Sequence, residues 1–384
     1  MPEHPDRRSA TRRRVFAAAA LLIALTIAEL LCRLVATLLA GIAPAGAAAP
    51  LAADAAWSEY QAAGYDYQPF ALWRHREFSG DHVAFDAAGR RRTVNPSLSR
   101  AGARRVRIAF FGGSTIAGLG VDDAHTIPSL VSAILARRHP DIAFDAENLG
   151  VGAYVSSQDV IAFWRAIWLG EESWDLAVFY EGANDGWVSF WRTPGGHNYD
   201  ELIDARLRYR DESRSLREVV HGVARELSEQ DAIWLLRLPC RALSRWTAPA
   251  PIARPTPDDR VEIAARVWTG NLRLLDALCR ERDIGALLVL QPVAALGERI
   301  DEATLARLHA LSSRDHFRRL YAMVRTATGV LADDFSAILD GREDVWLDWC
   351  HLNAAGNALV AAALADRVEA RLCERGRIDR PGDE

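Results

Sequence analysis

Lysine is absent from this chain of 384 residues, so all 46 of its basic side chains belong to arginine. A phosphate-binding loop of the G-x-x-x-x-G-K-[ST] type is therefore excluded, because that loop needs its lysine at the phosphates. The segment Gly118-Leu119-Gly120 lacks the third glycine of a dinucleotide-binding fingerprint. The net charge of −5 gives no electrostatic reason to expect a nucleic-acid partner.

Cysteine is also scarce, and its spacing excludes the common metal sites. No paired metal-binding spacing occurs among the five cysteines, which are Cys32, Cys240, Cys279, Cys350 and Cys373. The ten histidines are scattered, and no two of them stand at a convincing ligand spacing. We therefore predict no metal and no cofactor, and we interpret Cys350 as a small packing residue rather than a nucleophile.

Apolar residues make up 50% of the chain, which is enough for a sizeable core. Strand-like runs alternate with helical patterns, and this order favours a parallel sheet covered by helices on both faces. The expected strands are 106–111, 143–149, 176–180 and 286–291, and the expected helices are 128–138, 156–169, 261–282, 315–328 and 352–371. The prediction is an α/β fold, a three-layer sandwich around a parallel, flavodoxin-like sheet.

The first of these strands ends in a glycine turn that carries a serine. Gly112 and Gly113 follow the apolar run 106–111, and Ser114 comes next. Ligands of open α/β sheets bind at the carboxyl ends of the strands, so the Ser114 hydroxyl stands where a nucleophile would act. The alternative is a purely structural turn, for which glycine and serine are both suited.

His351, near the other end of the chain, is a candidate general base, and Asp348 precedes it by three residues. On a loop or a first helical turn, this spacing lets the carboxylate hold one ring nitrogen while the other nitrogen accepts the serine proton. The alternative is a surface pair or a helix cap.

Two further segments follow expected strands. The run 176–180 leads into Asn184 and Asp185, and an asparagine there can point its amide N–H at a developing oxyanion. The alternative is a plain turn, where both residue types are common. Segment 148–154 is rich in small residues that let a ligand approach the backbone N–H groups, or it is an ordinary connection.

In this order, the four segments resemble the blocks of the SGNH, or GDSL, hydrolase family. The matching segments are 111–114, 148–154, 182–185 and 348–351. The resemblance covers roughly residues 106–373. Two positions depart from the family pattern. Gly113 replaces the usual aspartate, and Ala153 stands where the family usually has its oxyanion glycine, with Gly152 just before it.

The resemblance implies the mechanism of a serine esterase. Ser114 would attack the ester carbonyl, His351 would carry the proton, and Asp348 would orient His351. The implied oxyanion donors are the backbone N–H of Ser114, the side chain of Asn184 and the backbone N–H of Ala153 or, as the alternative, of Gly152.

The N-terminus predicts where the protein works. Five arginines lie in a basic tail, residues 1–14, before an apolar segment, 15–42, whose only charged residues are Glu29 and Arg33. These two are four residues apart and can pair on one helix face. The segment is long enough to span a bilayer, and the arginines predict a cytoplasmic tail and an exported remainder. The alternative is a signal cleaved near 45–47, which would release a secreted protein.

The remaining segments complete the predicted domain layout. Residues 43–104 form a linker and an aromatic strap, 105–376 the catalytic domain, 186–259 an insertion within it, and 377–384 a polar tail. The strap either packs on the domain or lets Trp73 and Arg74 shape the substrate entrance. Trp187 and Trp191, at the start of the insertion, either line a substrate pocket or form the insertion's own small core.

Three functions are compatible with these residues. We expect an ester hydrolase that removes an acyl group, outside the cytoplasmic membrane, from a small ester, an acylated glycan or a lipid. The alternative is an O-acyltransferase that modifies a cell-envelope or exported polysaccharide with the same residues. The second alternative is a non-catalytic envelope protein. The sequence leaves the acyl group, the alcohol and the oligomeric state open.

Overall fold

A computed structural model of the chain describes residues 24, 26–31, 33, 55–100, 102–170, 172–192, 196–197, 220, 223–224, 234–247 and 256–379. The chain divides into two compact units. One comprises Ala48–Asn198 and Arg254–Glu384, and the other comprises Met1–Ala47 and Tyr199–Ala253. The first unit contains every residue of the predicted site.

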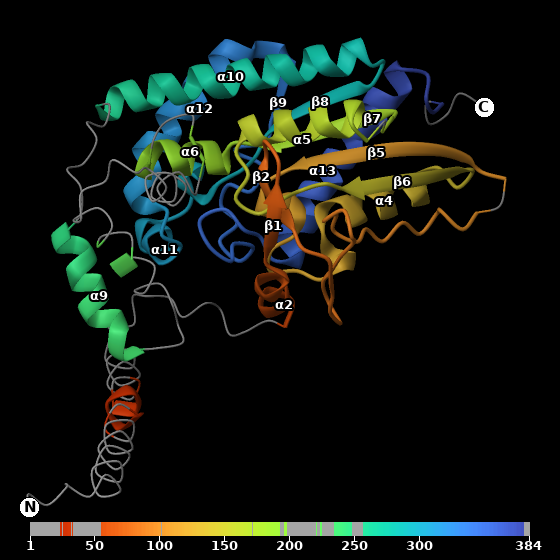
Figure 1. The fold of residues 1–384 in the computed structure, drawn as a ribbon. Coiled ribbons are helices and arrows are strands. Elements are labelled where there is room, and N and C mark those ends of the chain that lie inside the picture. The colour runs from red at the N-terminus through yellow and green to blue at the C-terminus, as the bar shows by residue number, and fades with distance from the viewer. Residues whose placement is uncertain are drawn as a thin grey trace, which may run out of the picture. The chain divides into compact units, whose positions relative to one another are not determined.

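A five-stranded sheet forms the centre of the first unit (Figure 1). Its strands, in spatial order, are β6 (Ile142–Asn148), β5 (Arg104–Gly112), β7 (Leu176–Glu181), β8 (Gly285–Leu290) and β9 (Ala332–Asp334). All of these strands pair in parallel. Every residue of β7 is buried, because a parallel sheet is covered on both faces and its inner strands are continuous apolar runs. The predicted α/β fold with a parallel sheet is confirmed.

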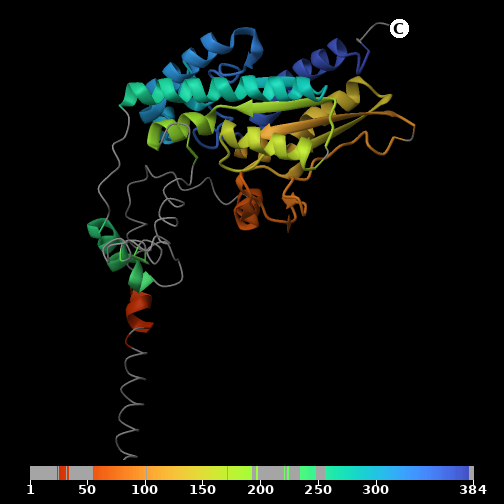
Figure 2. The same cartoon turned by 45° about the horizontal axis from the view of Figure 1, so that its top comes forward.

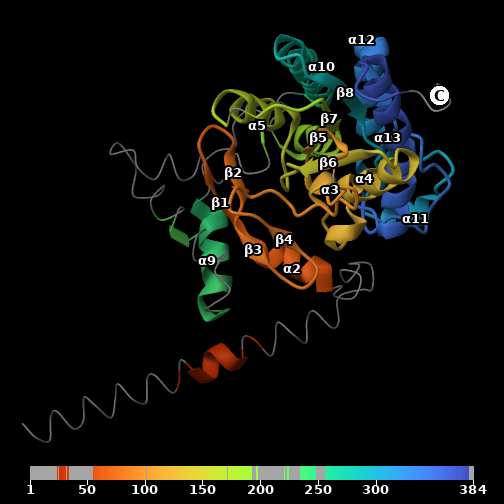
Figure 3. The ribbon, with the colours of Figure 1, turned by 90° about the vertical axis from the view of Figure 1, so that its right-hand side faces the viewer.

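Helices cover both faces of the sheet (Figures 2 and 3). One face carries α4 (Ile127–Arg138) and α13 (Ala354–Glu374), and the other carries α5 (Ser156–Trp168), α10 (Pro257–Glu281) and α12 (Arg314–Thr328). Between sheet and helices, the rings of Phe111, Phe163 and Phe179 contact one another and are fully buried. Burial of such rings stabilises the fold and fixes the sheet against its helices.

Most element bounds lie within a few residues of the expected ones. α13 begins at Ala354 rather than 352, because Asn353 caps it: the side-chain oxygen of Asn353 accepts the N–H of Gly356 at 3.0 Å. The elements that were not expected include β9, which has only three residues, and α6 (Ala183–Trp191), which follows β7 directly.

Residues 55–93 form a segment that we call the strap. It consists of α2 (Ala55–Ala63), a hairpin of β1 (Tyr65–Gln68) and β2 (Leu72–His75), and a hairpin of β3 (Phe78–Ser79) and β4 (Ala84–Phe85). These strands are too short to show an alternating pattern in the sequence. The strap lies beside β6, where the backbone N–H of Arg91 donates to the carbonyl of Asn148 at 3.1 Å.

The connections place a topological switch between β5 and β7. The chain passes from β5 to β6 on one side and then returns past β5 to reach β7 on the other. Ligand sites of open α/β sheets lie outside the carboxyl ends of the strands at such a switch. Those two ends are followed by α3 (Ser114–Ala117) and by α6, so the predicted serine and asparagine come to the same edge of the sheet.

In the second unit, residues 24, 26–31 and 33 are helical, and α9 (Trp234–Thr247) lies in the same unit. Nε of Arg33 donates to Oε1 of Glu29 at 2.8 Å, so the predicted pairing of these residues is confirmed. None of the helices described is both long and apolar enough to cross a bilayer. Outside the described residues lie the basic tail 1–14, the rest of 15–42, the predicted linker and cleavage site within 43–54, residues 101 and 171, nearly all of 193–233, 248–255 and 380–384.

Candidate active site

Ser114 is the first residue of α3, and two glycines form the turn that precedes it. Gly112 has a φ of +152°, and a Cβ there would lie 2.7 Å from the carbonyl oxygen of Tyr180. A Cβ at Gly113 would lie 2.5 Å from Nδ2 of Asn184. The missing side chains therefore let β7 and the Asn184 amide approach the serine. This close approach is a physical reason for glycine at position 113.

The loop that carries Asp348 and His351 is closed by its own backbone. The N–H of Leu347 donates to the carbonyl of His351 at 2.9 Å. Oδ1 of Asp348 accepts the N–H of Cys350 at 2.9 Å and that of His351 at 2.8 Å, a turn that aspartate forms readily. Oδ2 of Asp348 lies 2.7 Å from Nδ1 of His351. One carboxylate therefore both shapes the loop and holds the imidazole ring.

A continuous chain of hydrogen bonds joins Ser114, His351 and Asp348. Assigning the Nδ1 proton of His351 to the bond with Asp348 leaves Nε2 to accept from the Ser114 hydroxyl, 2.6 Å away. Burial alone would raise the pKa of Asp348, but the charge and hydrogen bond of His351 lower it to about 2. Asp348 is therefore ionised at neutral pH, and this is the form that stabilises an imidazolium.

The loop after β6 contains the other predicted donors. Ala153 has a φ of +65°, the left-handed conformation that glycine adopts without strain, so alanine here follows the backbone path of the expected glycine. The N–H of Gly152 donates to Nε2 of His75 at 3.2 Å, so this donor is engaged within the protein. Nδ2 of Asn184 donates to the carbonyl of Tyr154 at 2.8 Å, which fixes the orientation of the Asn184 amide.

The loop that carries Asp348 and His351 offers a possible set of metal ligands. Ligand atoms of Asp348, Cys350 and His351 lie within 4.8 Å of one another. Both carboxylate oxygens and both ring nitrogens already form the hydrogen bonds described above. Burial and, to a lesser extent, Asp348 raise the pKa of the Cys350 thiol well above its usual value, which disfavours the thiolate that metals bind. These contacts fit proton transfer better than metal binding.

Tryptophans surround the loop of His351. Trp187 of α6 stacks on Trp349, with ring centroids 4.7 Å apart and an interplanar angle of 17°. Trp191, 49% exposed, lies with its centroid 5.8 Å from that of Trp187. Trp57 of α2 meets the His351 ring in a T-shaped contact at 6.1 Å. Trp187 therefore packs on the loop of the site rather than only within the predicted insertion.

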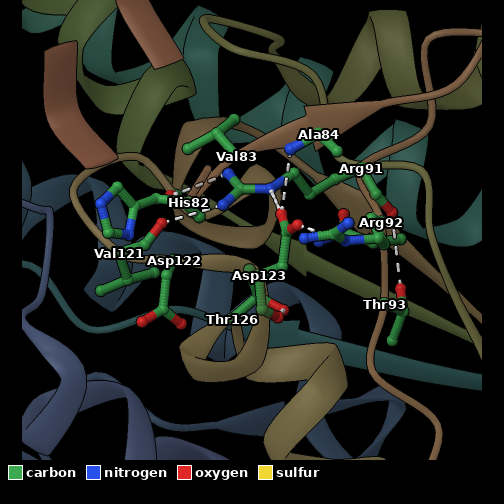
Figure 4. A network of polar contacts seen from close by, with 12 residues as sticks. His82, Val83, Ala84, Arg91, Arg92, Thr93, Val121, Asp122, Asp123 and Thr126 are labelled. Atoms are coloured by element: carbon green, nitrogen blue, oxygen red, sulfur yellow. Dashed lines mark hydrogen bonds and ion pairs between the residues drawn. The ribbon is translucent and has the colours of Figure 1, made fainter. Parts of the chain in front are cut away.

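Arg91 of the strap binds the last residue of α3 and the loop after it, and Figure 4 shows its contacts with Val121 and Asp123. Its guanidinium donates to the backbone carbonyls of Ala117, Gly118 and Val121 at 2.9, 3.2 and 2.9 Å. Nε of Arg91 donates to Oδ1 of Asp123 at 2.5 Å, and the Arg91 side chain is completely buried. A buried guanidinium needs a charged partner, and Asp123 supplies it, so the strap can hold the helix that carries the serine.

Several residues at the site gave no signal in the sequence. Arg91 is one of many arginines, and His75 and Trp57 stand alone in an aperiodic segment. Asp185 belongs to a predicted block but had no predicted role. Its carboxylate accepts the N–H and the hydroxyl of Ser156 at 3.0 and 2.6 Å, which ties the segment after β7 to the start of α5.

No model of a known protein family matches the sequence, and no curated protein matches it significantly. An acetylxylan esterase of known structure from Geobacillus stearothermophilus is 13% identical, with a TM-score of 0.38 over 69% of this chain and 95% of the other. A GDSL-like lipase from Bacteroides thetaiotaomicron is also 13% identical, with a TM-score of 0.33 over 69% and 88%. An α/β hydrolase enzyme from the metagenome of Lake Arreo, Spain, is 15% identical, with a TM-score of 0.37 over 69% and 95%. The basis for assigning an activity to this chain is the geometry of its site.

Proposed function

We propose that this protein is a serine ester hydrolase. Ser114 is the nucleophile, His351 the general base and acid, and Asp348 the residue that orients His351. The observation that carries the proposal is the pair of hydrogen bonds, 2.6 Å and 2.7 Å, that joins the three side chains. This order of hydroxyl, imidazole and carboxylate, at the carboxyl edge of a parallel sheet, is suited to nucleophilic acyl transfer.

The chemistry follows from the geometry. Oγ of Ser114 attacks the ester carbonyl carbon while its proton moves to Nε2 of His351. The bond to the leaving alcohol then breaks, His351 returns the proton to the alcohol oxygen, and an acyl-serine remains. Water attacks this acyl group and gives a proton to His351, and the carboxylic acid departs as Ser114 recovers its proton. Asp348 stabilises the imidazolium of His351 both when the acyl-serine forms and when it is hydrolysed.

We assign the negative oxygen of the tetrahedral intermediate to three donors. They are the backbone N–H groups of Ser114 and Ala153 and the side-chain amide of Asn184. The Asn184 amide lies close to position 113, beside Ser114, and this supports the N–H of Ser114 and the side chain of Asn184 as donors to one oxygen. The left-handed backbone at Ala153 and the engagement of the Gly152 N–H with His75 support the second. Each such donor contributes about 100- to 1,000-fold to the rate.

A small ester, an acylated glycan or a lipid is the substrate class that we propose. We also propose that the catalytic unit works outside the cytoplasmic membrane, held there by segment 15–42. The arginines of residues 1–14 and the length of the apolar run support this orientation. In spheroplasts of cells that express the full chain, externally added protease should cleave a tag at the C-terminus but not one at the N-terminus. Protection of both tags would contradict the proposal.

Hydrolysis of p-nitrophenyl acetate by the purified full chain tests the activity. Ser114→Ala should lower kcat/KM by about 1,000-fold or more, because the nucleophile is lost. Ser79→Ala, an exposed serine of β3, is the matched control and should leave the rate unchanged. Equal hydrolysis by the wild type and by Ser114→Ala would overturn the proposal.

An added oligosaccharide acceptor separates hydrolysis from transfer. We expect release of acetate whether or not the acceptor is present. Acyl transfer to the acceptor that depends on Ser114, with little free acetate, would instead identify an O-acyltransferase that uses the same nucleophile.

A further inference from the structure

Trp73, on β2 of the strap, contacts the loop that carries one of the proposed oxyanion donors. Its indole Nε1–H donates to the carbonyl oxygen of Gly152 at 2.9 Å, and the side chain is buried. That carbonyl belongs to the same peptide unit as the N–H of Ala153. A trans peptide is planar, and its C=O and N–H point in opposite directions. The bond from Trp73 therefore fixes the direction of the Ala153 N–H as well.

Tyr154, the next residue of the loop, connects the same tryptophan to a second proposed donor. The hydroxyl of Tyr154 donates to the backbone carbonyl of Trp73. The backbone carbonyl of Tyr154 accepts Nδ2–H of Asn184 at 2.8 Å. The rings of Trp73 and Tyr154 also meet in a T-shaped contact, with centroids 5.6 Å apart. Trp73 thus holds the loop on both sides of Ala153.

His75, two residues along the same strand, holds the preceding peptide. Its Nε2 accepts the N–H of Gly152 at 3.2 Å and lies 3.0 Å from the hydroxyl of Tyr60. Burial and, secondarily, the charge of Arg91 lower the pKa of His75 to about 3, so the ring is neutral at neutral pH. The N–H of Gly152, which points at Nε2, assigns the lone pair of the neutral ring to that nitrogen. Successive peptides of the loop are therefore bound to one strand of the strap.

We propose that Trp73 is a positioning residue of the oxyanion hole, because its indole N–H orients the peptide between Gly152 and Ala153 so that the Ala153 N–H faces the substrate carbonyl. This inference rests on the proposed ester hydrolysis. It makes the strap a part of the catalytic apparatus rather than a segment that only packs on the domain. A hydrogen bond to the carbonyl also polarises the peptide, which strengthens the N–H as a donor.

The test is Trp73→Phe, which removes the indole N–H and keeps an aromatic ring. Active sites are counted by titration with a fluorophosphonate, and kcat for phenyl acetate is expressed per active site. We expect this kcat to fall about 10- to 100-fold, which is less than the loss expected when an oxyanion donor is removed outright. KM should stay within about threefold, because the developing oxyanion, and not the bound ester, needs this peptide orientation. Trp164→Phe on α5, a 38% exposed tryptophan, is the matched control and should leave kcat unchanged.

Tyr154→Phe is the second variant, which keeps the test open if Trp73→Phe does not fold. It removes only the hydroxyl that binds Trp73, and we expect a smaller fall in kcat at unchanged KM. If both variants lose active sites but keep the wild-type kcat per site, Trp73 is purely structural and the inference fails, while the proposed function stands. If the wild type hydrolyses phenyl acetate no faster than Ser114→Ala, the proposed function itself fails.

Discussion

The hydroxyl of Ser114 lies 2.6 Å from Nε2 of His351, although 237 positions separate the two residues in the sequence. The fold brings them together because Ser114 follows β5, while the loop of His351 is tied to the end of β8. The N–H of Ala294, just beyond β8, donates to the carbonyl of Trp349 at 2.9 Å. The carboxyl ends of parallel strands meet at one edge of a sheet, and both groups stand at that edge.

Asp348→Asn should lower kcat about 1,000- to 10,000-fold with little change in melting temperature. An amide in place of Oδ2 would donate to Nδ1 of His351, and the imidazole would then carry its proton on Nε2 and could not accept that of Ser114. Steady-state kinetics on phenyl acetate measure the effect. Asp344→Asn, whose side chain on the same loop is 69% exposed, is the matched control and should behave as wild type. A loss below about tenfold in Asp348→Asn would contradict the assigned role.

Ala153→Gly should stabilise the protein slightly, by about 0.5 kcal/mol, and leave kcat nearly unchanged. The left-handed conformation costs alanine about 1–2 kcal/mol, and the greater entropy of glycine in the unfolded chain offsets part of the gain. Ala162→Gly, within helix α5, is the control and should lose about 1 kcal/mol. Urea unfolding measures both variants. Equal losses in the two would mean that Ala153 is not left-handed in solution.

Arg91→Met and Arg92→Met should differ sharply in their cost, although both arginines bind the carboxylate of Asp123. The side chain of Arg91 is 0% exposed and that of Arg92 is 57% exposed. Arg91→Met should lower the free energy of unfolding by about 3–5 kcal/mol, because it leaves a buried carboxylate without its buried partner. Arg92→Met should lower it by less than about 1 kcal/mol, because that ion pair is exposed. The midpoints of urea unfolding give the comparison. Similar shifts of the midpoint in the two variants would contradict the conclusion that the buried Arg91 anchors α3.

The stability of the protein should fall as the pH rises from about 5 to 8, because of two buried acids. Burial raises the pKa of Asp159 and of Glu181, and each lies close enough to affect the other. In the unfolded protein these carboxyls have a pKa near 4, and in the folded protein their pKa is higher. Their contribution to the free energy of unfolding is therefore fully present below about pH 4 and is lost as the pH rises through the pKa of the folded state.

Glu181→Gln should flatten this pH dependence and raise the unfolding free energy at pH 8 by about 1–3 kcal/mol, since one of the two buried charges is removed. Melting curves between about pH 5 and pH 8 measure the slope. Glu374→Gln, at a largely exposed carboxylate near the end of α13, is the control and should keep the wild-type slope. The same slope in Glu181→Gln would show that this carboxyl does not titrate as we infer.

Four local patterns in the sequence predicted the parts of the site that the fold brings together. Apolar runs such as 106–111 and 176–180 predict buried strands, because both faces of a parallel sheet are covered by helices. Glycines at positions 112 and 113 marked the sharp turn at Ser114, because only a residue without a Cβ fits so close to the neighbouring strand. The carboxyl ends of such strands share one edge, and this made a meeting of the serine and the asparagine predictable.

The contacts of the strap could not be predicted in the same way. Arg91, Trp73 and His75 stand in short segments with no periodic pattern, and hydrogen bonds join them to residues as far as 81 positions away. Nothing local to a lone arginine or tryptophan indicates which distant carbonyl it will meet, because that is decided by how the strap packs against the domain.

The sequence by itself indicated four of the five strands of the sheet, the turns that follow them and the residues suited to the proposed chemistry, since these depend on hydrophobic period and on backbone freedom within a few residues. Only the tertiary structure decided which groups hold those residues in place. Distances and directions of hydrogen bonds arise from the packing of segments far apart in the chain, and the binding of Gly152 between Trp73 and His75 is such a result.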